Sequence, residues 1–179
     1  MLTLYLVRHA TAVPAGSGVG DHDRPLTPGG VGEAEALGRF LAGAGLACDA
    51  AACSSALRTR QTAEALLRGA GAQRSPESAD ELYNASGDTL LRWIHARPAG
   101  SRRLLVVAHM PGVGELTSLL ATEHSDLALG FPAATLAVIE SEVEAWADWD
   151  YGRGALQLLL PGTCLGGLER EAQGLRKGR

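Results

Sequence analysis

The chain has 179 residues, of which 46% are hydrophobic and 4% aromatic, and its formal net charge is −4. This length supports one domain with a full core, and the acidic balance argues against a nucleic-acid-binding protein, which would carry a basic face. No apolar run approaches the roughly 20 residues of a membrane span, and Arg8 interrupts the apolar N-terminus, so we expect a cytoplasmic protein without a signal peptide or a membrane partner.

The first predicted element is a buried strand from Leu2 to Val7, rich in branched and aromatic side chains. Arg8 and His9 follow it directly, where a parallel strand reaches the active edge of an α/β sheet. Arginine is a permanently charged, forked phosphate ligand, and histidine can be a neutral nucleophile near pH 7. The pair indicates phosphoryl chemistry on histidine. A strand-end histidine with a satisfied hydrogen bond is the alternative.

A loop rich in glycine and proline follows, from Ala12 to Pro25. It is too long for an ordinary connection and is a candidate to cover a site. Within it we interpret Asp23 and Arg24 as a loop salt bridge or turn, and substrate binding is the alternative role for the two residues. A helix is then predicted, with Thr27 as its N-cap and Pro28 at its first position. Its apolar stripe consists of Val31, Ala34, Leu37 and Leu41.

A second strand, from about Ala50 to Cys53, leads through two serines into a helix from about Ala56 to Gly69. Ser54 and Ser55 suit the N-cap of this helix. Arg58 lies near the first turn, beside the positive end of the helix dipole, where an anion is readily held. A surface salt bridge is the alternative role for this arginine.

The third strand of this kind, Arg103 to Ala108, ends at His109 and precedes a helix from about Gly112 to Ala121. His109 therefore repeats the position of His9, although a buried structural histidine is the alternative. Asp88 is the predicted N-cap of a further helix upstream of this strand. Three strands thus end in Arg-His, in Ser-Ser followed by arginine, and in histidine.

Two β-like segments, Ala134 to Ser141 and Ala155 to Leu160, predict an antiparallel pair that completes the sheet. Leu165 to Arg179 is rich in glycine, arginine and glutamate, and we expect it to fray. We therefore predict one domain over residues 1–164. Its expected fold class is α/β, a three-layer α/β/α sandwich whose central sheet is mostly parallel with an antiparallel edge strand.

Three motifs resemble, in order and spacing, those of the histidine phosphatase superfamily, also called phosphoglycerate mutase-like. They are Arg8 to Ala10, Ser54 to Glu64 and Val106 to Pro111. Asp23 to Gly30 is similar to the short bacterial phosphohistidine phosphatase branch, the SixA-like proteins. The resemblance covers about Met1 to Pro161. It implies that His9 is the transient phosphohistidine.

The same resemblance implies that Arg8, Arg58 and His109 form the phosphate pocket. The residue chemistry agrees, because phosphoryl transfer needs an in-line nucleophile and cations around the equatorial oxygens. Nearby arginines also disfavour the charged form of His9. Since these side chains already offset the phosphoryl charge, we expect no metal and no other cofactor. The three cysteines have no metal-like spacing and are predicted to be reduced thiols: Cys48, Cys53 and Cys164.

The resemblance also implies a carboxylate proton donor in the region Asp80 to Tyr83, where Glu81 is our candidate. A surface carboxylate that precedes a helix is the alternative. Thr11 is a candidate to contact the phosphate. Met110 stands where the family usually has asparagine, and the asparagine that larger members carry after the first motif is absent, which argues against mutase activity. The remaining histidines are interpreted as structural or exposed, without convergent partners: His22, His95 and His124.

The leaving group bears on the substrate. An imidazole, with a reference pKa of about 6.5, needs less protonation than an alcohol, whose pKa is near that of water at about 15.7. A weak or missing acid therefore favours phosphohistidine on a protein, such as a histidine phosphotransfer domain. Two alternatives stay open: a phosphatase of a small ester such as a sugar or nucleotide phosphate, and a non-catalytic sensor of phosphate or phosphoprotein.

Overall fold

The computed structural model describes residues 1–124 and 129–165, so nearly all of the tail that the sequence predicts to fray lies outside the described residues. Six strands form one sheet in the order β3-β2-β4-β1-β5-β6. The first four in chain order pair in parallel, and the last two are antiparallel to their neighbours, as predicted. The strands are β1 (Leu2–Arg8), β2 (Ala50–Ser54), β3 (Glu77–Ala79), β4 (Arg103–Ala108), β5 (Thr135–Ser141) and β6 (Ala155–Pro161).

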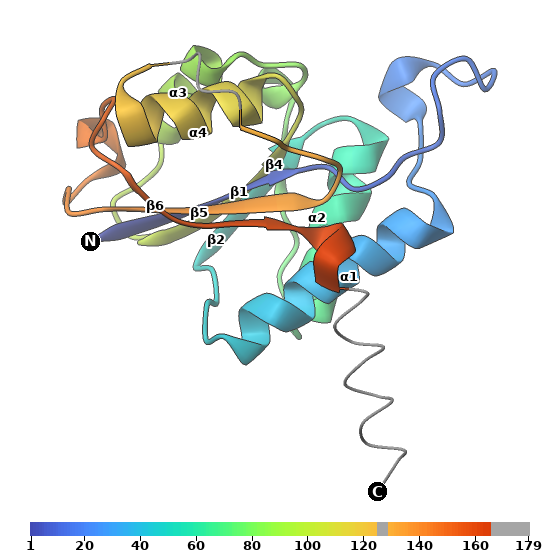
Figure 1. The fold of residues 1–179 in the computed structure, drawn as a ribbon, viewed down its shortest axis with the longest axis horizontal. Coiled ribbons are helices and arrows are strands. Elements are labelled where there is room, and N and C mark those ends of the chain that lie inside the picture. The colour runs from blue at the N-terminus through green and yellow to red at the C-terminus, as the bar shows by residue number, and fades with distance from the viewer. Residues whose placement is uncertain (125–128, 166–179) are drawn as a thin grey trace, which may run out of the picture.

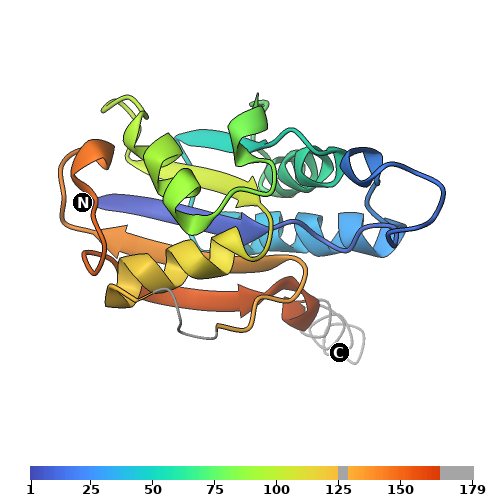
Figure 2. The ribbon, with the colours of Figure 1, turned by 90° about the horizontal axis from the view of Figure 1, so that it is seen from above.

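Helices cover both faces of this sheet, so the structure has the predicted three layers (Figure 1). Two lie on one face and two on the other, where Figure 2 shows them in green to yellow across the strands. The first pair is α1 (Pro28–Gly43) and α2 (Leu57–Gly69), and the second is α3 (Gly87–His95) and α4 (Gly112–Thr122). No helix in the described ranges combines the length and apolar character needed to cross a membrane.

The central strands are apolar throughout because both of their faces are buried. In β1, Leu4 and Leu6 pack in the core cluster that includes α3 and α4, whereas Tyr5 and Val7 pack in the cluster that includes α1 and α2. This alternation follows from the two-residue period of a strand. Buried strands 104–107 and 136–139 divide between the two cores in the same way. The central strands are thereby packed between two apolar cores.

The helix starts agree only in part with the sequence-based prediction. Thr27 caps α1 as predicted, with its hydroxyl accepting from the Gly30 amide at 3.0 Å. Asp88 is not the cap of α3: Ser86 is, and its hydroxyl accepts from the Thr89 amide at 3.3 Å. The helix begins one residue before Asp88, at Gly87, which packs so closely on α4 that a Cβ there would overlap Glu115.

Four short elements were not predicted from the sequence. They are β3 and three 3-10 turns, η1 (Asp21–Asp23), η2 (Asp80–Leu82) and η3 (Trp146–Asp148). Their length explains this, because three residues give too few positions for a periodic pattern. Of these turns, η1 supplies residues to the candidate site, and Tyr83, which also belongs to it, directly follows η2.

Candidate active site

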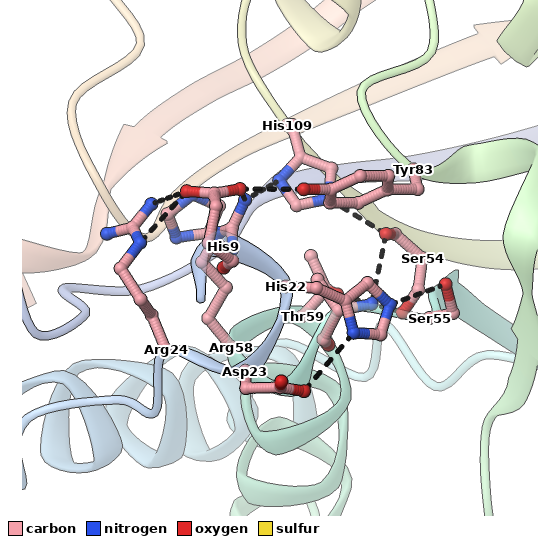
Figure 3. A network of polar contacts seen from close by, with 12 residues as sticks. His9, His22, Asp23, Arg24, Ser54, Ser55, Arg58, Thr59, Tyr83 and His109 are labelled. Carbon is pink, nitrogen blue, oxygen red and sulfur yellow. Dashed lines mark hydrogen bonds and ion pairs between the residues drawn. The ribbon is translucent and has the colours of Figure 1, made fainter. Parts of the chain in front are cut away.

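His9 and His109 lie side by side at the carboxyl edge of the sheet (Figure 3). They follow neighbouring parallel strands whose register pairs Arg8 with Ala108, and the His9 amide donates to the Ala108 carbonyl at 3.1 Å. The two imidazole rings stand edge to face, with centroids 5.4 Å apart. The predicted juxtaposition of the two strand-end histidines is therefore present.

The surroundings of His9 fix its tautomer and keep it neutral. Its Nδ1 lies 2.9 Å from the Ala10 carbonyl oxygen, which can only accept, so Nδ1 carries the proton and Nε2 has the free lone pair. Burial lowers the pKa of His9 to about 4. The bond to Ala10 acts in the opposite direction, and the charges of Arg58 and Arg8 lower the pKa further. At pH 7 the ring is therefore neutral, with the lone pair that a nucleophile needs.

His109 is buried and is held by two polar contacts. Its Nδ1 lies 3.3 Å from an Arg58 terminal nitrogen, which can only donate, and its Nε2 lies 2.8 Å from the Ser54 hydroxyl. Nε2 therefore carries the proton and donates it to Ser54. Burial, followed by the charge of Arg58, lowers the pKa of His109 to about 3, so this ring is also neutral.

The two serines after β2 do not cap α2 as predicted. The N-cap is Ala56, which makes no side-chain cap bond. Ser54 is fully buried at the end of β2, and its hydroxyl orients His109 and accepts weakly from the Ala56 amide at 3.4 Å. The Ser55 hydroxyl lies 3.1 Å from Nε2 of His22. Both hydroxyls instead contact histidines, His109 and His22, whose proximity to the serines could not be predicted from the sequence. The capping interpretation fails for this reason.

Two arginines extend along the same edge. Arg8 donates from a terminal nitrogen to the Phe131 carbonyl at 2.6 Å. Arg58, at 3% exposure, donates to the carbonyl of Asp21 at 2.5 Å and to its carboxylate at 3.1 Å. The Nε atoms of both arginines are buried and have no hydrogen-bond partner in the described part of the chain. Buried donors without partners are rare, and here they leave two N–H groups of permanent cations for an anion.

A second polar cluster stands beside Arg58, and the sequence did not reveal it. The carboxylate of Asp21 accepts from the Tyr83 hydroxyl at 2.8 Å and from Arg24 at 2.8 and 3.0 Å. The bonds from Tyr83 and Arg24, together with the charge of Arg58, hold the pKa of Asp21 far below its usual range. Arg24 thus pairs with Asp21 rather than with Asp23. The spacing of three residues between Asp21 and Arg24 was the signal in the sequence that could have indicated this pair.

His22 also has partners, contrary to expectation. Its ring packs edge-on against Tyr83 with centroids 5.1 Å apart, and its Nδ1 lies 3.4 Å from the Asp23 carboxylate (Figure 3). Tyr83 in turn packs edge-on against His109 at 5.6 Å. The turn η1 is therefore attached to the strand-end histidines through an aromatic ring, and the long loop does lie against the candidate site.

Two sequence candidates have other surroundings. Thr11 donates from its hydroxyl and its amide to the Glu33 carboxylate, both at 3.0 Å, which ties it to α1. Glu81 is exposed in η2, and its carboxylate makes no hydrogen bond or ion pair with any described residue. Tyr83, two residues further on, is the side chain of this region that reaches the cluster around Arg58. We find no group of three metal-ligating side chains within the described ranges.

The family model of the histidine phosphatase superfamily (branch 1) matches residues 4–86. An uncharacterized protein of Mycobacterium tuberculosis is 36% identical over 158 residues, which are 84% of this chain and 96% of that protein. A solved structure from Nakamurella multipartitia, provisionally assigned as the phosphohistidine phosphatase SixA, is 40% identical with a TM-score of 0.74. The match covers 89% of this chain and 95% of that one.

A second solved structure, from Agrobacterium tumefaciens, carries the same provisional assignment. It is 31% identical with a TM-score of 0.72, and covers 89% of this chain and 97% of its own. The protein histidine phosphatase SixA complexed with tungstate has a TM-score of 0.77 at 22% identity, and the match covers 92% of this chain and 99% of that one. This last likeness concerns the fold.

Proposed function

The chain belongs to the histidine phosphatase superfamily, and we propose that it hydrolyses a phosphoryl group through a covalent intermediate on His9. One observation carries the proposal: a neutral histidine, with its lone pair on Nε2, stands beside two arginines whose buried Nε–H groups have no partner among the described residues. A binding protein would need the arginines but not the nucleophile. The catalytic residues of this proposal are His9, Arg8, Arg58 and His109.

The reaction has two steps. Nε2 of His9 attacks phosphorus in line, the N–P bond forms, and the bond to the leaving group breaks with its electron pair passing to that group. Water then attacks the phosphohistidine, an O–P bond forms, the N–P electron pair returns to His9, and the proton of the water passes to the phosphate or solvent. The hydrogen bond from Nδ1 to Ala10 keeps the ring oriented through both steps.

Charge stabilisation comes from side chains in this proposal. Arg8 and Arg58 face the developing negative charge, and a guanidinium fork suits a phosphoryl group. A dianion bound beside His109 would favour protonation of its Nδ1, because an opposite charge raises the pKa of an imidazole. His109 would then donate to a phosphoryl oxygen while Nε2 stays bonded to Ser54. We propose that catalysis is metal-independent, because the arginines beside the nucleophile already supply the positive charge that a metal ion would provide.

We propose protein phosphohistidine as the substrate, in a partner such as a histidine phosphotransfer domain. Glu81 is exposed and makes no polar contact with the part of the chain that the structure describes, and Asp21 has a pKa too low to supply a proton near pH 7. A site without a strong general acid suits an imidazole leaving group better than an alcohol. The provisional assignments of the relatives that are 31% and 40% identical support the same choice.

The test is phosphate release from a phosphorylated histidine phosphotransfer domain, compared with release from a sugar phosphate and a nucleotide phosphate. We expect rapid release from the protein, and a loss of roughly 10⁴-fold or more in His9→Ala. His124→Ala removes an exposed histidine and is the matched control. Release from the small esters alone would redirect the assignment to a phosphomonoesterase. Binding of phosphate without any release would indicate a sensor.

A further inference from the structure

The carboxylate of Asp21 lies where an anion on Arg58 would bind. Both terminal nitrogens of Arg58 donate to Asp21, one to its carbonyl and one to its carboxylate, while the buried Nε has no partner in residues 1–124 and 129–165. A phosphoryl group that takes the usual two-pronged grip on a guanidinium needs two of these nitrogens. One terminal nitrogen of Arg58 already engages both of its hydrogens, with the Asp21 carboxylate and with Nδ1 of His109. A grip that includes this nitrogen and leaves the His109 contact in place therefore replaces its bond to Asp21.

We propose that Asp21 is an internal competitor for the phosphoryl group, and that its carboxylate sets how tightly the site holds both substrate and product. The inference rests on the proposed function only in placing the phosphoryl group on Arg58. Because the ligand binds the fraction of molecules in which Asp21 has moved away, its apparent dissociation constant is raised by the inverse of that fraction. The binding of substrate and the binding of released phosphate are weakened by the same factor.

The position of Asp21 makes displacement inexpensive. Its side chain is 48% exposed, against 3% for Arg58, and net contributions of exposed ion pairs are small. Residues 14–21 are all exposed, so the carboxylate can leave without opening the core. A phosphoryl dianion carries twice the charge of the carboxylate and is attracted more strongly by the same cations.

The other groups that bind Asp21 stay in place when it leaves. Arg24 also donates to the Val13 carbonyl at 2.8 Å, and the ring of Tyr83 packs between His22 and His109. The Arg24 guanidinium and the Tyr83 hydroxyl thus lose their acceptor but keep their orientation, and they remain as hydrogen-bond donors beside Arg58. We assign them as additional ligands for the oxygens of the incoming phosphoryl group.

A benefit of this arrangement concerns turnover. A site with two or three fixed cations retains inorganic phosphate after the N–P bond is cleaved, because product and substrate share the same charged group. A tethered carboxylate is always present at a high effective concentration and returns to Arg58 as phosphate dissociates. Asp21 would thereby limit product inhibition without entering either chemical step.

The experiment is calorimetric titration of the full chain with inorganic phosphate. We compare the natural protein with Asp21→Asn and with Asp23→Asn, which removes the same charge from the same turn but has no contact with Arg58. Asp21→Asn should lower the dissociation constant about 5- to 10-fold, which corresponds to a competitor-free fraction of roughly 10–20% in the natural protein. Asp23→Asn should change it less than about twofold.

Weaker or unchanged binding in Asp21→Asn would overturn the proposal and make Asp21 a residue that positions Arg58. An equal fall of the dissociation constant in both variants would also overturn the proposal, because loss of one negative charge from the turn would then explain the result without any competition for Arg58. Asp21→Ala, which removes the acceptor entirely, should bind at least as tightly as Asp21→Asn, and thermal melting checks that each variant is folded. Failure to hydrolyse any phosphohistidine, with phosphate binding intact, would reject the proposed function and leave this inference standing.

Discussion

The strand-end histidines and the loop from Ala12 to Pro25 contribute to one site by opposite means. His9 and His109 are fixed by the backbone register of β1 and β4 between two cores. Asp21 reaches the same place on an exposed turn and is held mainly by polar side-chain contacts. The sheet thus positions the proposed reacting groups, whereas exchangeable side-chain contacts position the carboxylate that we propose governs anion affinity.

After the loss of His9 itself, the largest effect is expected at Arg58, which belongs to both regions because it contacts His109 and Asp21. Arg58→Ala should lower kcat/KM by roughly 10²- to 10³-fold, since a fixed charge beside the phosphoryl group is lost. Steady-state kinetics on the phosphorylated domain measures this. Arg60→Ala, an exposed position on the same helix, is the control and should retain activity. Comparable losses in the two variants would contradict a specific phosphate contact.

A smaller effect is expected where the sheet orients His109. Ser54→Ala leaves the buried Nε2 proton of His109 without its acceptor and should reduce kcat/KM about tenfold, or about 1.4 kcal/mol. The fall should lie in kcat rather than KM, because Ser54 positions the histidine without touching substrate. Ser55→Ala, whose hydroxyl contacts His22 instead, is the matched variant. A purely structural role for Ser54 would lower the melting temperature and leave kcat intact.

Acid should destabilise the folded protein through protonation of the strand-end histidines. Their pKa values, about 4 for His9 and about 3 for His109, lie below that of an unfolded histidine, near 6.5. Between about pH 6.5 and 4 the unfolded chain binds more protons, so the free energy of unfolding should fall as the pH falls, by on the order of 2 to 4 kcal/mol. Urea denaturation at several pH values measures this. In His109→Ala the slope should be shallower, and an unchanged slope would contradict the assignment.

The smallest effect is expected at Glu81. With phosphohistidine as substrate, Glu81→Gln should change kcat/KM by less than about twofold, because an imidazole leaves without a strong acid. The exposed neighbour Asp80→Asn serves as the control. A fall of more than about tenfold in Glu81→Gln alone would restore this carboxylate as the proton donor and would place it in reach of the leaving group during turnover.

Most of the fold could be predicted because its elements carry periodic patterns. The apolar runs of β1 and β4 and the apolar stripe of α1 predicted the bounds of these elements almost to the residue. The ends of the two strands pointed to His9 and His109 as site residues. Caps were predicted less well, because a hydroxyl or carboxylate near a helix start has several possible partners. The Ser54 hydroxyl is hydrogen-bonded to His109 instead of capping α2, and Ser86 rather than Asp88 caps α3. Both outcomes depend on tertiary neighbours.

The cluster around Asp21 could not be predicted for a related reason. Its members lie in a loop and in two single-turn elements, and no periodicity links Asp21 to Tyr83 across 62 positions. The aspartate chosen from the sequence, Asp23, adjoins Arg24, yet the turn directs Asp21 toward it. Which of two acidic residues in a turn faces an arginine is decided by backbone geometry that composition does not encode.

The hydrogen bond that the His9 amide donates to the Ala108 carbonyl has a further consequence, for hydrogen exchange and for heat inactivation. It continues the ladder of the two central strands, so the His9 amide should exchange its hydrogen with solvent only when the whole sheet opens. Amides in residues 14–21 lie on the exposed loop and should exchange through local fluctuations. Loss of activity on heating should therefore coincide with global unfolding, and proteolytic nicks in the loop should precede it.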